Sequence, residues 1–115
     1  MCKEMLNPER SQRMKADAGK LRISLVPTEI IRSIARVREY GVNKYGKKES
    51  WRCVEPERYR DAFLRHVLLW MDDPHGRDAE SGLLHLEHIA CNVAFLLELD
   101  RPNRSKGAEA RNERA

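Results

Sequence analysis

The 115-residue chain is long enough for one domain, but a domain of this size buries only about 65% of its unfolded surface, so we expect a thin core. Aromatic residues make up 6% and charged residues 35%, which favours a helical domain over a β-sandwich. No apolar run approaches the roughly 18 residues that span a bilayer, and Met1 to Arg10 is too charged for a signal peptide. We therefore expect a cytoplasmic protein.

The three cysteines, Cys2, Cys53 and Cys91, are widely spaced and form no CxxC pair. This pattern predicts neither a disulfide framework nor a zinc ribbon. We expect free thiols, with Cys91 as a small core residue.

Residues 1–18 are polar and are predicted to form a partly flexible N-terminal arm. The run from Asn7 to Arg10 is typical of a helix start and Gly19 of a helix end, so a short helix is expected there. The apolar run from Leu21 to Val26 is too short for an independent sheet. We expect an extended arm that lies across the helices, and it is the one place where a strand would suit the sequence.

Residues 19–100 are predicted to form one helical domain. The first helix begins at Pro27-Thr28-Glu29 and ends at Gly41, and the loop from Val42 to Glu55 follows it. One face of this helix is apolar, with spacings of three and four residues. That face carries Ile30, Ile31, Ile34 and Val37.

Two further helices complete the predicted domain. The second begins at Glu55-Pro56-Glu57 and stops near Asp73, and the third runs from about Ser81 or Gly82 to Leu99. The expected inward residues are Tyr59, Phe63, Val67 and Trp70 on the second helix, and Leu86, Ile89, Ala90, Val93 and Leu97 on the third. The fold class is therefore an all-α bundle of three main helices.

The segment 101–115 is predicted to be a disordered basic tail. It holds five of the 22 basic residues and two of the 18 acidic ones, so the rest of the chain is nearly neutral. The net charge of +4 is thus a weak argument for a nucleic-acid partner, and we expect none.

A row of polar residues lies beside the apolar stripe of the third helix. His85, His88 and Asn92 are three and four residues apart, and Phe95 continues the row. The second helix adds Asp61, Arg65 and His66. An antiparallel hairpin would bring Arg65 and His66 towards the row. The alternative is that these side chains only satisfy one another between helices, and that Asp61 and Arg65 form a surface ion pair.

The loop around Lys44 contains groups that a triphosphate requires: an amine, a glycine that lets backbone approach, and nearby basic residues. Tyr45 and Trp51 could stack on a base. The alternative for Trp51 is a core plug. The acidic linker with Asp72, Asp73, Asp78 and Glu80 could help to hold a divalent cation, or it is simply solvated. The two long helices show no ExxE and ExxD pair.

Taken in order, these residues resemble the family of N-terminal domains of phage dATP/dGTP diphosphohydrolases, which is associated with MazZ and the MazG-like nucleotide pyrophosphohydrolases. The resemblance covers about residues 19–99. The matching residues are Gly19-Lys20, Leu25-Val26-Pro27, Gly41, Lys44-Tyr45-Gly46, Trp51, Tyr59, Asp61-Ala62, Arg65-His66, Gly82, His85-Leu86 and Asn92.

The resemblance implies an all-α fold, a homo-oligomer, and hydrolysis of a purine deoxynucleoside triphosphate to the monophosphate and pyrophosphate with Mg²⁺. In that case Asp61 and His85 would hold the metal, and His66 or His88 would act as the general base together with Asp61 at the catalytic centre. The substrate-binding residues would be Lys20, Lys44, Tyr45, Gly46, Trp51, Arg65, His85 and Asn92.

Two other functions stay open. MazG-like enzymes use several acidic metal ligands, whereas the facing positions here carry few carboxylates and many cations. This composition favours a module that binds a purine nucleotide without cleaving it, as a regulator or as a phage sponge for a signalling nucleotide. A helical oligomerisation protein is the remaining alternative, because Leu64, Leu68 and Met71 lie off the main stripe of the second helix.

Overall fold

The computed structural model describes residues 18–104, which divide between two compact units. Residues 18–26 belong to the first unit, and Pro27–Asn103 form the second. The first unit contains a short 3-10 helix, η1 (Ile23–Leu25). Its turn is closed by hydrogen bonds from Leu25 N to Arg22 O and from Val26 N to Ile23 O, both 3.0 Å. The run from Leu21 to Val26 thus contains one 3-10 turn and no strand, and the helix predicted before Gly19 falls outside the described residues.

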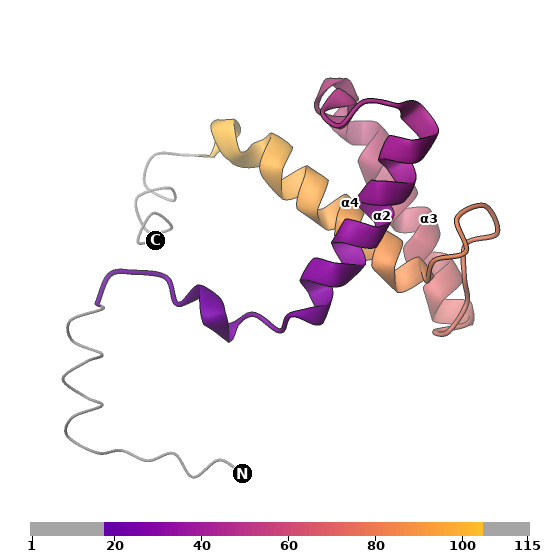
Figure 1. Ribbon diagram of the computed structural model, residues 1–115, viewed down its shortest axis with the longest axis horizontal. Helices are drawn as coiled ribbons and strands as arrows, with labels where there is room; N and C mark the ends of the chain where they lie inside the picture. Colours follow the sequence, from indigo (N-terminus) through magenta and orange to yellow (C-terminus); the bar gives the residue numbers. More distant parts are fainter. Residues whose placement is uncertain (1–17, 105–115) are drawn as a thin grey trace, which may run out of the picture. The chain divides into compact units, whose positions relative to one another are not determined.

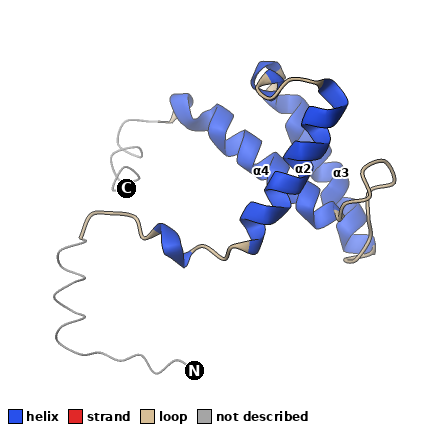
Figure 2. Ribbon diagram, in the orientation of Figure 1, coloured by secondary structure: helices blue, strands red, loops and turns tan. Residues whose placement is uncertain are grey.

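The second unit consists of helices joined by loops, and no strand occurs between residues 18 and 104 (Figures 1 and 2). The main helices are α2 (Glu29–Tyr45), α3 (Pro56–Asp72) and α4 (His85–Asp100). Two 3-10 helices accompany them, η2 (Ser50–Cys53) and η3 (Arg101–Asn103). Helix α4 packs against both α3 and α2. The predicted all-α class with three main helices is confirmed.

The first main helix continues past the residue that was expected to end it. Gly41 lies inside α2, and the helix ends at Gly46, whose φ of 81° places it in the left-handed region. The Gly46 N–H donates to Val42 O at 2.7 Å and closes the last turn. Glycine is the residue that adopts this conformation without strain, so Gly46 is the C-terminal cap and Gly41 an interior glycine.

Helix α3 follows the prediction closely. Pro56 occupies the first turn, where its missing N–H costs nothing, and Glu57 lies at the positive end of the helix dipole. The residues predicted to face inward, Tyr59, Phe63, Val67 and Trp70, are all half-buried.

Helix α4 begins at His85, later than predicted, because the preceding residues form a compact loop. Within this loop Gly76 N donates to Asp73 O, Asp78 N to Leu83 O, and Gly82 N to Asp78 O, each at 2.8 Å. Gly82 has a φ of 74°, which is incompatible with a helix start. The loop 73–84 is thus closed by its own backbone, and it is the segment drawn between α3 and α4 in Figure 1.

The inward face of α4 is the polar row, and of the predicted apolar stripe only Ile89 and Ala90 are half-buried. Leu86, Val93 and Leu97 are 47%, 37% and 57% exposed, whereas the residues buried on α4 are His85, Glu87, His88, Cys91 and Asn92. A helix can turn only one face towards α3, and here pairing of polar groups across the helices outweighs burial of the stripe. Cys91 is 2% exposed and is the one fully buried hydrophobic residue among those described, as expected of a small core residue.

The helical unit ends after η3, so Arg101 to Asn103 are ordered as a 3-10 turn instead of belonging to the predicted tail. The rest of that tail lies outside the described residues. The unit also begins at Pro27, later than the predicted boundary at residue 19. Along the described part of the chain, none of the helices combines the length and apolarity that crossing a membrane requires.

Candidate functional site

Three of the four histidines meet between α3 and α4. His66 of α3 lies with its Nδ1 2.9 Å from Nδ1 of His85, the first residue of α4. The His66 ring also stacks on that of His88, with centroids 4.6 Å apart and planes 6° from parallel. Because His85 and His88 are three residues apart, both project from the same face of α4 towards α3.

The loop 73–84 delivers a carboxylate to these rings. Asp78 Oδ2 accepts hydrogen bonds from the backbone N–H groups of Glu80 (3.1 Å) and Ser81 (2.8 Å), which fix the side chain at the turn. Ser81 Oγ in turn lies 2.7 Å from His88 Nε2 and accepts a bond from Leu83 N at 3.2 Å. The loop is therefore connected to the His88 ring by a direct hydrogen bond from Ser81.

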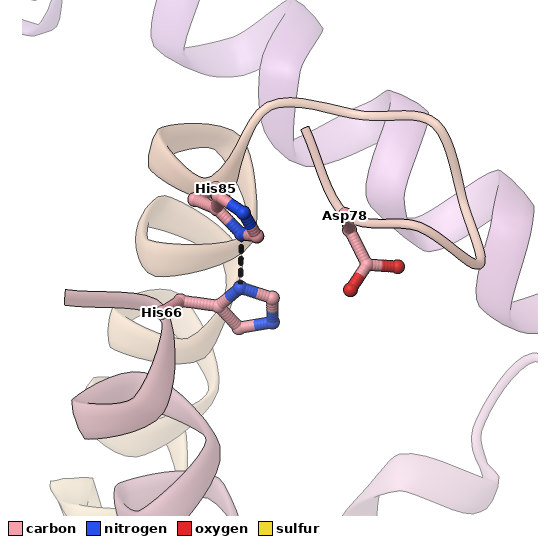
Figure 3. A group of neighbouring side chains, drawn as sticks. All are labelled: His66, Asp78 and His85. Carbon is pink, nitrogen blue, oxygen red and sulfur yellow. Dashed lines mark hydrogen bonds between the residues drawn. The ribbon is translucent and has the colours of Figure 1, made fainter. Parts of the chain in front are cut away.

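His66, Asp78 and His85 have the donor atoms of a metal site. Each offers one ligand atom, and these atoms lie within 4.8 Å of one another. Figure 3 shows His66 and His85 facing each other, with the Asp78 carboxylate beside them. We call these three residues the histidine–aspartate cluster. Two imidazoles and one carboxylate suit an ion of the first transition series better than Mg²⁺, which prefers oxygen ligands.

The protonation states of these groups favour binding of a cation. Burial, followed by repulsion from His88, lowers the pKa of His66 to about 4, and burial also lowers the pKa of His88. Burial alone would raise the pKa of Asp78, but the hydrogen bonds from Ser81 outweigh it and the pKa is lowered. Near neutral pH, His66 and His88 are therefore neutral and Asp78 is ionised.

Lys44, at the end of α2, is tied to the same loop. Its Nζ donates to Glu80 Oε2 at 2.5 Å, and this contact with Glu80 raises the pKa of Lys44. The Lys44 ammonium also lies over the rings of Tyr40 and Tyr45, at 5.9 and 5.2 Å from their centroids. Tyr45 and Gly46 are the two substrate-binding residues predicted beside Lys44. Tyr45 is 68% exposed, and Gly46 caps the helix.

Trp51 occupies a packed position in the bundle. Its ring stacks on Phe95 of α4 with centroids 4.5 Å apart, and the Arg52 guanidinium lies 4.5 Å from the Trp51 centroid. Tyr59 donates from its hydroxyl to Trp51 O at 2.7 Å. These contacts favour a packing role for Trp51 in the core over a role in stacking on a base. Asn92 is also buried, and its Nδ2 donates to His88 O at 2.9 Å, one turn back on α4.

The remaining predicted site residues lie on the surface. Asp61 and Arg65 are exposed on α3, and Asp61 is not part of the histidine–aspartate cluster. Lys20 is exposed and belongs to the other unit. The structure therefore groups His85 with Asp78 and His66 in place of Asp61. The acidic linker was the signal for Asp78, whereas nothing in the sequence pattern pointed to Ser81.

A groove lies between α2 and α4, on residues other than the cluster. This groove has a volume of about 620 Å³ and is lined mainly by apolar side chains, among them Ile30, Leu84, Leu86 and Ile89. At its side Arg36 Nη1 donates to Glu87 Oε2 at 2.6 Å, and Glu87 Oε1 accepts from Leu84 N at the start of α4. Charged residues also line the groove, but Arg36 donates to Glu29 Oε2 at 3.1 Å as well as to Glu87, so these groups are paired with one another and the cluster is the better candidate for chemistry.

The fold and the cluster together define a small helical protein with imidazoles and a carboxylate gathered where two helices and their connecting loop meet. Residues 10–109 match the family described as dATP/dGTP diphosphohydrolase, N-terminal, and the chain belongs to that family.

A relative from Salmonella phage PMBT28, named dATP/dGTP diphosphohydrolase, is 36% identical over 86 residues. The match covers 75% of this chain but 29% of the relative, so the chain spans less than a third of the length of that protein. The family resemblance seen in the sequence is thus confirmed. No solved structure matches the chain.

Proposed function

We propose that this chain binds a purine deoxynucleoside triphosphate and takes part in its hydrolysis to the monophosphate and pyrophosphate. The family and the name of the phage relative support the substrate class. The observation that carries the proposal is the histidine–aspartate cluster on a loop that also holds Lys44 through Glu80. Neutral imidazoles, a carboxylate and an ammonium group beside one loop are the groups that such a hydrolysis uses.

In the proposed reaction, water attacks the α-phosphorus, the bond from that phosphorus to the bridging oxygen breaks, and pyrophosphate leaves. His66 or His88 accepts the proton of the water, because both rings are neutral near pH 7. Lys44 and Arg65 would offset the phosphate charge. Mg²⁺ would enter bound to the triphosphate, and its charge would neutralise the phosphate oxygens that it contacts.

Lys44 has to exchange partners in this proposal. Its ammonium group is paired with Glu80, and a phosphate oxygen would replace that carboxylate. The exchange would free Glu80 at the loop that carries Asp78. Substrate binding would then be linked to the position of the loop.

Binding without cleavage is the second candidate. One observation favours it: the histidine–aspartate cluster contains a single carboxylate, fewer than metal-assisted phosphoryl transfer usually employs. In this case the same imidazoles and Lys44 hold the nucleotide as part of a regulator.

Phosphorus NMR of dATP and dGTP with the protein and Mg²⁺ separates the two candidates. Appearance of monophosphate and pyrophosphate, lost in His88→Ala but retained in His75→Gln, supports hydrolysis. His75 is the appropriate control because it is exposed in the same loop and lies outside the cluster. A thermal shift with nucleotide but no product supports binding alone, and neither response rejects both.

We also propose that the chain forms a homo-oligomer through α3. Leu64, Leu68 and Met71 recur at spacings of four and three residues, so they share one face, and they are 50%, 64% and 65% exposed. Association of two such faces would enlarge the thin core of the helical unit.

A further inference from the structure

We propose that His66, Asp78 and His85 form a site for a divalent transition-metal ion of the Mn²⁺, Fe²⁺, Co²⁺ and Zn²⁺ class. This goes beyond the proposed hydrolysis, since it depends only on the donor atoms and their arrangement. It also replaces the pair expected from the sequence, Asp61 and His85, by a set of three residues that the fold brings together.

The spacing of the two ring nitrogens is the first argument. Two nitrogen ligands about 2.1 Å from one ion and at right angles to each other are about 3.0 Å apart. The Nδ1 atoms of His66 and His85 are 2.9 Å apart. One proton between them makes a hydrogen bond, and with ring centroids 5.1 Å apart the two nitrogens face each other directly, so both rings would turn towards one side to bind a metal ion in place of that proton.

The distance from the carboxylate to the two ring nitrogens is the second argument. The three ligand atoms lie within 4.8 Å of one another, and ligands on opposite sides of one ion are about 4.2 Å apart. The three atoms are thus within about 0.6 Å of the spacing that one ion requires.

Each ligand is held by a neighbour that fixes its direction. His66 stacks on His88, and Asp78 Oδ2 is held by two backbone N–H groups. His85 donates from its backbone N to Gly76 O at 3.1 Å, and a Cβ on Gly76 would approach the His85 ring to 3.3 Å. Supporting contacts of this kind orient ligands before the ion arrives and raise metal affinity.

The identity of the donors selects the class of ion. Mg²⁺ and Ca²⁺ take oxygen ligands, whereas imidazole nitrogens bind Mn²⁺, Fe²⁺, Co²⁺ and Zn²⁺. Three protein ligands leave further positions for water or for a phosphate oxygen, which is the pattern of catalytic and not of structural sites. His66 and Asp78 are only half-buried, so these positions are accessible from solvent.

The test is calorimetric titration of the tag-free, chelator-treated protein with Co²⁺, Zn²⁺ and Mg²⁺ as separate probes. We expect one Co²⁺ or Zn²⁺ per chain, bound at least tenfold more tightly than Mg²⁺. Asp78→Asn keeps an acceptor for the turn but removes the charge, and it should lower Co²⁺ affinity at least tenfold. His85→Gln should do the same, and His75→Gln should leave the affinity unchanged.

Nitrogen-detected imidazole NMR of the wild-type chain provides a readout that requires no variant to fold. Zn²⁺ should shift the ring signals of His66 and His85 and leave those of His75 in place. The proposal is overturned if Mg²⁺ binds as tightly as Co²⁺, if affinity survives Asp78→Asn and His85→Gln, or if the ring signals do not move. In that case the histidines form only a structural hydrogen bond.

Failure of this proposal and failure of the proposed hydrolysis can be distinguished, and with an ion on His66 Nδ1 the base of that reaction would be His88. Metal binding in a chain that releases no pyrophosphate supports the site and rejects the reaction. Hydrolysis with Mg²⁺ in a chain that does not bind Co²⁺ or Zn²⁺ supports the reaction and rejects the site.

Discussion

Lys44 and Glu80, 36 positions apart in the chain, form an ion pair at 2.5 Å that joins the end of α2 to the loop before α4. Glu80 is two residues from Asp78, whose carboxylate belongs to the histidine–aspartate cluster. The amine proposed to bind phosphate is therefore tied to the loop that carries Asp78, by a carboxylate that would compete with phosphate for it.

This relationship predicts opposite effects of two substitutions on nucleotide affinity. Lys44→Ala removes a charged hydrogen bond to phosphate and should weaken dATP or dGTP binding by about tenfold or more. Glu80→Gln removes the competing carboxylate and should strengthen it. Calorimetry measures both, with Lys47→Ala as the control for loss of a nearby positive charge. Equal affinity in all three variants would exclude Lys44 from the binding site.

The lowered pKa of His66 predicts a pH-dependent stability. An unfolded histidine titrates near pH 6.5, whereas burial, then repulsion from His88, lowers the folded pKa of His66 to about 4. Between these values the unfolded chain binds a proton that the folded chain does not. The free energy of unfolding should therefore rise with pH across this window. The contribution of His66 is present above pH 6.5 and is lost as the pH falls towards 4.

Urea unfolding of the chelator-treated protein across that window measures the slope. His66→Gln should flatten it, because the substituted side chain does not titrate. His75→Gln, at an exposed position, should leave it unchanged. A slope that is the same in wild type and His66→Gln would show that His66 is not protected from protonation.

Two glycines predict opposite responses to the same substitution. A Cβ at Gly76 would lie 3.1 Å from Asp73 O and 3.3 Å from the His85 ring, so Gly76→Ala should cost about 1 kcal/mol or more through overpacking. At Gly41, inside α2, the nearest atom is 4.0 Å away, and Gly41→Ala should stabilise by about 0.5 to 1 kcal/mol. Thermal unfolding tests the pair, and a stabilised Gly76→Ala would contradict the packing against His85.

The course of the helices could be predicted because it depends on local signals. Pro56 with Glu57 marked the start of α3, and the 3.6-residue period marked its inner face. The end of α2 was missed because both Gly41 and Gly46 qualify as stop signals. Choosing between them requires knowing which one has positive φ, and that depends on the loop that follows.

The row His85, His88, Asn92 could be recognised from its spacing, but the direction that it faces could not. An apolar stripe lies beside it, and hydrophobicity alone favours burying the stripe. The decision comes from contacts between helices, such as His66 with His85 and Trp51 with Phe95. Asp78 joins the cluster because the loop folds back on its own backbone, and such a turn has no periodicity to reveal it.

The exposed face of α3 predicts a dissociable assembly. Leu68 is 64% exposed, and in a monomer a polar replacement at such a position changes stability by less than about 0.5 kcal/mol. If Leu64, Leu68 and Met71 of two chains pack together, Leu68→Asp places a charge in an apolar contact and should convert the oligomer to monomer. Sedimentation equilibrium over a range of concentrations measures this directly. Leu25→Asp, at a leucine that is 68% exposed outside the helical unit, is the matched control and should retain the oligomer. A wild-type chain that stays monomeric at every concentration would contradict the assembly, and the exposed leucines would then be ordinary surface residues of a domain with a thin core.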